Sequence, residues 1–219
     1  MDEIGAVEAA VERMARNLAV GFSALSYAAV DKTLLGATLG TTPFGFNDVC
    51  LDVAAIRACY YSDSRTIALE GETWHTGQTL DAVKLDAFRT WVTAALAHEA
   101  CHLLQHRQEP HRFGPKSEAG EADALSRKAK STGLPADYVA YVSCALEIEA
   151  HATQLAAELR PAGQLSYDAF FAAAKASDLV AHVKRKSTSS DGDPWPAWDL
   201  LETTLIDGAW AASEMMWGR

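Results

Sequence analysis

The feature that most constrains this fold is a run of apolar residues at helical spacing between residues 81 and 108. Apolar side chains recur on two sides of the expected helix, at Leu96, Ala100, Leu103 and Leu104 on one side and at Phe88, Val92 and Ala95 on the other. A helix that is apolar nearly all round is buried in its protein. We therefore expect a long, buried helix over residues 81–108, with Asp81 as a candidate N-cap.

Three polar residues interrupt this apolar pattern, in the stretch ALAHEACHLLQHRQ at residues 95–108. His98 and His102 are one helical turn apart, about 6 Å along the axis, so both imidazoles can bind one metal ion. Glu99 is rotated by about 100° from His98 and can instead reach a water molecule beside that ion. This H-E-x-x-H spacing is typical of a zinc site in which the glutamate is a general base. Because burying three unpaired polar groups is costly, their placement favours a metal site.

A catalytic zinc ion usually has three protein ligands and one open position, so a third ligand is needed. His106 follows His102 by one turn but is about 12 Å from His98 along the axis, too far for the three to share an ion. We expect His106 at the helix end or facing solvent. A metzincin would have Gly at 105 and His at 108, and the residues Gln105 and Gln108 exclude that branch.

A second long helix, expected from about Pro135 to Leu159, offers the third ligand. Pro135 suits the first turn of a helix. Glu147 and His151 are four residues apart on one face, amid apolar residues. Glu149 falls on the opposite side of the helix, where we expect it to be solvated or ion-paired.

The stretches HEACH (98–102) and EIEAHA (147–152) together resemble the gluzincins, the thermolysin-like branch of the zinc metallopeptidases. They are also similar to small bacterial and phage metallopeptidases that carry E-x-E-A after HExxH. The resemblance covers about residues 65–155. It implies that His98, His102 and Glu147 are zinc ligands and that Glu99 is the general base. His151 stands where the family usually has Asp or Asn, and it is a catalytic donor to the oxyanion, a hydrogen-bond partner of a ligand histidine, or a ligand.

The resemblance implies a zinc-dependent peptidase, an endopeptidase in our interpretation, that hydrolyses a peptide bond with a metal-activated water and Glu99 as base. The reaction also needs a donor to the developing oxyanion. The sequence leaves four candidates for this donor: His151, Tyr138, Tyr141 and His75. A peptide or protein substrate held in extended form would suit an edge strand at residues 65–70.

Two other functions remain open from the sequence. The first is a non-catalytic helical binding or assembly protein with a structural or vestigial zinc site. The intact Glu99 argues against it, since a structural site needs no base. The second is a metal-dependent amidase that acts on a substrate other than protein, such as a peptidoglycan stem.

The expected fold class is α+β, predominantly α-helical. It has a minimal zincin-like core with a small sheet beside the HExxH helix, and a C-terminal helical extension. The expected elements are a helix at 2–19, a loop at 33–48, a strand at 65–70 preceded by a strand or helix, a loop at 109–121, a helix at 166–185 and a helix at 197–217. The metallopeptidase domain is expected to span residues 1–186. Residues 187–219 then form a linker and a helix that packs on the same domain.

Composition limits the partners. The formal net charge is −10 and KRK at 184–186 is the main basic cluster, so no nucleic-acid partner is expected. No secretion signal is apparent at the acidic N-terminus, and no stretch approaches the roughly 18 apolar residues of a membrane span. We expect a cytoplasmic protein without a membrane partner, and the oligomeric state stays open. The cysteines are too few and scattered for a disulfide framework: Cys50, Cys59, Cys101 and Cys144. Cys101 and Cys144 lie beside the motif residues, which suggests a metal ligand, but packing is the commoner role of a buried free cysteine.

Overall fold

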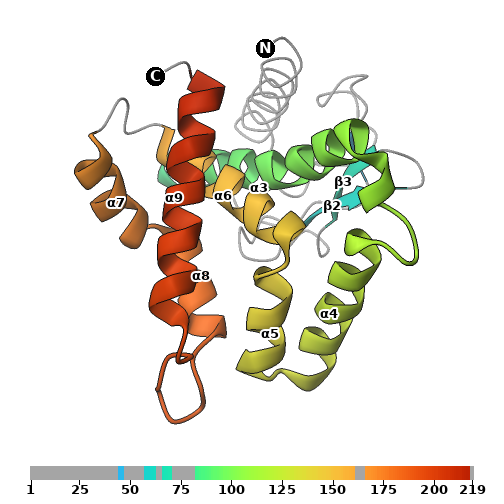
Figure 1. Cartoon of the computed structure of the whole chain (residues 1–219). Coiled ribbons are helices and arrows are strands. Elements are labelled where there is room, and N and C mark those ends of the chain that lie inside the picture. The colour runs from blue at the N-terminus through green and yellow to red at the C-terminus, as the bar shows by residue number, and fades with distance from the viewer. Residues whose placement is uncertain (1–43, 47–56, 63–65, 71–81, 161–165, 218–219) are drawn as a thin grey trace, which may run out of the picture. The chain divides into compact units, whose positions relative to one another are not determined.

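The computed structural model describes residues 44–46, 57–62, 66–70, 82–160 and 166–217 (Figure 1). This part of the chain is predominantly helical, as expected. The chain divides into two compact units, residues 1–103 and 104–219, and the boundary falls inside a single helix. The helix predicted at 2–19 lies outside the described residues. The predicted division into 1–186 and 187–219 stays a prediction.

In the first unit, three short strands form one sheet in the order β1-β3-β2. They are β1 (Phe44–Phe46), β2 (Arg57–Tyr61) and β3 (Thr66–Glu70). Strand β3 pairs antiparallel with β2 and parallel with β1. It confirms the strand predicted at 65–70, and β2 shows that a strand precedes it. The expectation that this strand lies at a sheet edge is wrong, because β3 is paired on both sides and leaves no open edge for a substrate peptide. The loop predicted at 33–48 is wrong at β1, because three residues are too few to show an alternating pattern. The zincin-like core stays a prediction.

Helix α3 (Ala82–Gln108) confirms the long helix that carries HEACH. Its buried residues include Ala94, Ala95 and Ala100 together with the polar His98 and Gln105. The buried helix implies that His98 and His102 are both buried, which is confirmed at His98, whereas His102 is only partly buried. A short 3₁₀ turn, η2 (Pro110–Arg112), follows the end of α3.

The predicted loop at 109–121 is wrong over its last residues, because helix α4 (Glu118–Thr132) begins there. Ala122 is the buried residue of α4, so this helix lacks the apolar stripe that would reveal it in the sequence. The helix ends at Gly133, whose φ of 65° and N–H bond to the Ala129 carbonyl make a left-handed C-cap.

The single helix predicted from Pro135 to Leu159 is wrong in its continuity. The structure has α5 (Pro135–Val142) and α6 (Ala145–Leu159), separated by Ser143 and Cys144. Cys144 is extended, with φ −62° and ψ 143°, and it precedes α6 as its N-cap residue. The break therefore places Glu147 in the first turn of a helix rather than in its middle.

The helix predicted at 166–185 is likewise two helices, α7 (Tyr167–Lys175) and α8 (Asp178–Lys186). The hydroxyl of Ser177 accepts a hydrogen bond from the Val180 amide and so caps the start of α8. Helix α9 (Trp198–Trp217) confirms the C-terminal helix. In the described helices we find none with the length and apolar character that crossing a bilayer requires.

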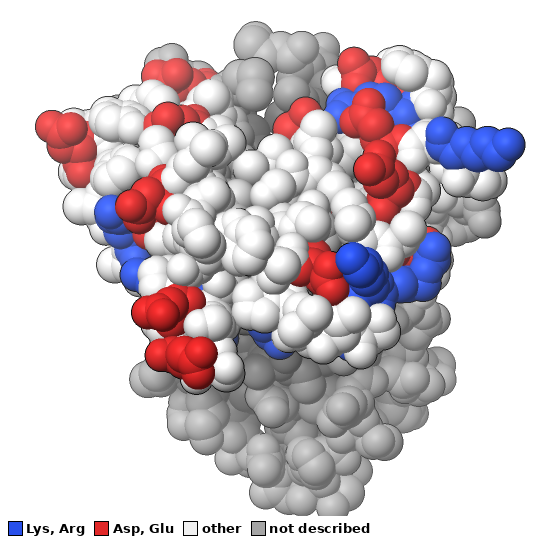
Figure 2. Space-filling view, turned by 60° about the horizontal axis from the view of Figure 1, so that its bottom comes forward, with Lys and Arg blue, Asp and Glu red and all other residues white. Residues whose placement is uncertain are grey.

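The hydrophobic core of the second unit lies around α6 and α9, which pack along one another and against α7 (Figure 1). Its largest fully buried side chains include Leu155 on α6, Phe170 on α7 and Leu205 on α9. This packing fixes α6, the helix that carries Glu147, from its buried side. On the face shown in Figure 2, acidic and basic side chains surround an area without charged residues.

Candidate metal centre

The structure brings together the three residues predicted as metal ligands. His98 and His102 come from α3, and Glu147 comes from α6. Each offers one ligand atom, and these atoms all lie within 4.8 Å of one another. His98 and Glu147 are buried and His102 is partly buried. Among the described residues, this group of histidine and acidic side chains can hold a metal ion.

The four-residue spacing on α3 explains how the two histidines meet. Side chains four residues apart lie on one side of a helix, one above the other. The His98 and His102 rings have their centroids 4.9 Å apart and their planes at 83°. Two ring nitrogens can therefore approach the same point from the same helix.

Glu147 supplies a carboxylate from the first turn of α6, where a negative charge is favoured by the partial positive charge of the helix N-terminus. The residue is only 7% exposed. A buried carboxylate is costly unless another charge compensates it, and a bound cation supplies such a charge. Two buried atoms here, His98 Nδ1 and Glu147 Oε2, form no hydrogen bond within the described part of the chain, although both residues have other interactions.

The charge of Glu147 also affects two neighbouring groups. Burial, together with this negative charge, raises the pKa of the Tyr138 phenol to about 12, so Tyr138 keeps its proton at neutral pH. Burial and Glu147 likewise raise the pKa of the Cys144 thiol, which donates a hydrogen bond to the Ala140 carbonyl. A metal ligand must be a thiolate, so this environment does not favour Cys144 as a ligand.

The donor set of two imidazoles and one carboxylate fits a divalent metal ion. Zinc in catalytic sites accepts this combination, and three protein ligands leave a coordination position open. Structural zinc sites usually have four protein ligands. The described part of the chain brings three such ligands together.

The two residues predicted to be catalytic lie beside the ligands in the sequence. Glu99, next to His98 in α3, is half-buried. His151, one turn after Glu147 in α6, is half-buried, and its Nδ1 lies 3.3 Å from Oε1 of Gln154. His151 is not in the group whose ligand atoms come together. The catalytic roles of Glu99 and His151 stay predictions.

Three other residues were considered from the sequence, two as oxyanion donors and one as a metal ligand. Tyr141 is half-buried, and its ring centroid lies 6.4 Å from that of Tyr138. His75 lies outside the described residues. His106 stacks on Phe113 at 4.4 Å and is not in the ligand group.

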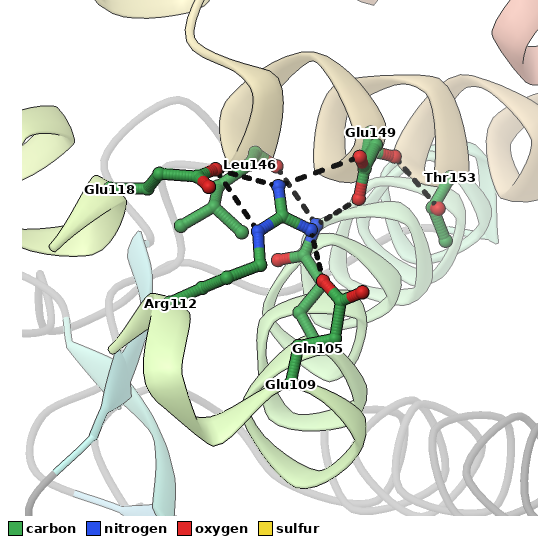
Figure 3. Close-up of polar contacts among 7 residues, drawn as sticks. All are labelled: Gln105, Glu109, Arg112, Glu118, Leu146, Glu149 and Thr153. Atoms are coloured by element: carbon green, nitrogen blue, oxygen red, sulfur yellow. Dashed lines mark hydrogen bonds and ion pairs between the residues drawn. The ribbon is translucent and has the colours of Figure 1, made fainter.

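A polar network next to the ligands was not predicted (Figure 3). Nε2 of Gln105 donates hydrogen bonds to the Leu146 carbonyl at 3.2 Å and to Glu149 at 2.7 Å. Arg112 pairs with Glu149 at 3.7 Å, which confirms that Glu149 is ion-paired. Arg112 also contacts Glu109 and Glu118. The partners of Gln105 are more than 40 residues away in the sequence, so no local pattern points to them.

No protein-family model matches the chain, and no curated protein or solved structure is significantly similar to it.

Proposed function

We propose that this chain is a zinc-dependent endopeptidase that hydrolyses a bond in a peptide or protein. The observation that carries the proposal is the grouping of His98, His102 and Glu147 from two helices. The ligand set is the one expected from HExxH and a distant glutamate. The gluzincin resemblance of the two motifs supports the same function.

In this proposal His98, His102 and Glu147 hold the metal. A zinc ion in such a site supplies Lewis acidity, which makes a water molecule more acidic and polarises a carbonyl group. Glu99 accepts a proton from the attacking water on its carboxylate and later delivers that proton to the nitrogen of the leaving amine. Glu99 suits the role of general base in this proposal because it is next to the ligand His98 in the sequence and is not itself a ligand.

Stabilising the oxyanion requires a donor that is protonated at neutral pH. Tyr138 meets this requirement, because a tyrosine phenol keeps its proton at neutral pH. His151 is the second proposed donor, and it stands four residues after Glu147 on α6.

The test compares the unsubstituted chain with Glu99→Gln, using a peptide-library cleavage screen and elemental analysis of the same samples. Glu214→Gln is the control, because Glu214 is an exposed glutamate on α9. We expect Glu99→Gln to retain zinc and lose turnover, and the control to behave like the unsubstituted chain.

Three other outcomes would change the assignment. Full turnover by Glu99→Gln would refute the role of Glu99 as base. Loss of zinc from that variant would make Glu99 part of the ligand set. Retained zinc without cleavage of any peptide, even by the unsubstituted chain, would favour the binding protein or an amidase with another substrate.

A further inference from the structure

We propose that Gln105 is a positioning residue of the metal centre, acting through α6 to hold Glu147 at the distance from His98 and His102 that a metal ion requires. This inference rests on the proposed function, since it assumes that these three residues bind a metal. Gln105 itself is not one of the ligands. Its contacts, described next, are the reason for the assignment.

Gln105 connects the two ligand-bearing helices one turn beyond His102 and beside the segment of α6 that contains Glu147. It follows His102 by three residues on α3, which places it about one turn further along the same helix. Its hydrogen bonds reach Leu146, the residue directly before Glu147, and Glu149, two residues after it. The amide of Gln105 therefore binds the short segment of α6 that contains the carboxylate ligand from both sides.

The hydrogen bond to the Leu146 carbonyl is buried, and the one to Glu149 is partly buried. Gln105 is 7% exposed, so the loss of a partner would leave a buried amide unsatisfied, which costs about 1–3 kcal/mol. The bond to Glu149 is also charge-assisted, and such bonds are stronger than those between neutral groups. Both properties make the link between α3 and α6 resistant to small displacements.

Arg112 holds the other partner of this link in place (Figure 3). Its guanidinium group lies among Glu109, Glu118 and Glu149, and its side chain is 13% exposed. It binds Glu118, at the start of α4, at 2.8 Å. The negative charge of Glu149 is thus balanced by a cation that is itself anchored, so Glu149 stays available to accept from Gln105.

Metal centres are sensitive to such displacements because ligand distances must fall within about 0.2 Å of their preferred values. A shift of α6 relative to α3 changes the distance between Glu147 and the histidine pair. A residue with a purely structural role would alter the stability of the fold. A positioning residue also alters the metal affinity of the folded chain.

The experiment measures the zinc affinity of the full chain by competition with a chromophoric chelator, after the metal has been removed by dialysis. Gln105→Met keeps the length of the side chain and removes both hydrogen bonds. Gln108→Met is the matched control, because Gln108 is an exposed glutamine on the same helix. We expect zinc affinity to fall roughly 10–100-fold in Gln105→Met and to stay unchanged in the control.

Glu149→Ala provides a second variant should Gln105→Met fail to fold. The Glu149 side chain is 50% exposed, so its truncation leaves no core cavity. We expect weaker zinc binding by a chain whose circular dichroism spectrum is unchanged. Glu214→Ala, on the exposed side of α9, should bind zinc as tightly as the unsubstituted chain.

The comparison uses each of Gln105→Met and Glu149→Ala that is folded. If these variants bind zinc as tightly as the unsubstituted chain, the positioning role is overturned and the proposed function stays intact. Absence of zinc binding by the unsubstituted chain would instead overturn the metal centre itself and the positioning role with it. The two failures are therefore distinguishable from the same titrations.

Discussion

The imidazole rings of His98 and His102 lie edge to face, with centroids 4.9 Å apart and planes at 83°. The two rings come from successive turns of α3, and together with the carboxylate of Glu147 they form the candidate metal-binding group. Because the ligand atoms come from two separate helices, metal binding links the tertiary structure of the chain to the chemistry of the site. Each residue of the group should then be necessary for metal binding.

The histidines of α3 allow this necessity to be tested with a control of the same residue type. His102→Gln removes a ligand, whereas His106→Gln changes a histidine that stacks on Phe113 outside the group. We expect His102→Gln to lose more zinc affinity than the roughly 10–100-fold that follows the loss of an outer hydrogen-bond partner. Isothermal titration calorimetry with zinc measures both. Equal losses in the two variants would show that His102 has no special role.

The link between α4 and α5 should be sensitive to acid. Asp137 binds Lys128 at 2.7 Å and accepts a hydrogen bond from Thr132 at 2.8 Å. These contacts, with Lys128 first, lower the pKa of the Asp137 carboxyl below its usual 3.8. The charged form is thus favoured in the folded chain. Its contribution to stability is present above the unfolded pKa and is lost as pH falls through the lower folded pKa.

Asp137→Asn should therefore lower the free energy of unfolding at neutral pH and reduce its decline with acid below about pH 4. The measurement is the urea midpoint as a function of pH. Asp123→Asn is the control, since Asp123 and its partner Arg127 are both exposed and such pairs contribute little. An unchanged acid dependence in Asp137→Asn would contradict the role of this carboxylate.

Helix α9 should stabilise the chain through its buried face. Leu205 is 0% exposed and Leu200 is 70% exposed on the same helix. Leu205→Ala leaves a cavity in the core and should cost about 2–5 kcal/mol, whereas Leu200→Ala should change stability by less than about 0.5 kcal/mol. Urea denaturation of both variants measures the difference. Similar costs at the two positions would contradict the packing of α9 on the α6 core.

Strong periodicity made some elements predictable. Helix α3 was predicted almost to the residue because its apolar positions repeat over many turns, and the same holds for α9. The breaks before α6 and α8 were missed, since apolar spacing continues across them and neither Gly nor Pro marks them. Ser177 could have indicated the start of α8, because serine is a favoured N-cap residue.

The candidate site was predictable to the extent that its residues follow helical spacing. His98 and His102 follow from a four-residue spacing on one helix, and Glu147 followed from helical phase and a motif resemblance. The partners of Gln105 were beyond reach, because its contacts depend on which helices pack together rather than on its neighbours in the chain. Arg112 lies in the segment predicted as a loop. Its ion pairs with three glutamates could not be predicted, because loop residues show no periodic pattern.

The most direct test of this account is the zinc stoichiometry and affinity of the unsubstituted chain compared with Glu147→Gln. Glutamine has nearly the same shape as glutamate but lacks the charge that compensates a cation. We predict one tightly bound zinc ion per unsubstituted chain and a large loss of affinity in Glu147→Gln, with both chains folded. A substituted chain that binds zinc as tightly as the unsubstituted one, or an unsubstituted chain that binds none, would contradict the metal centre.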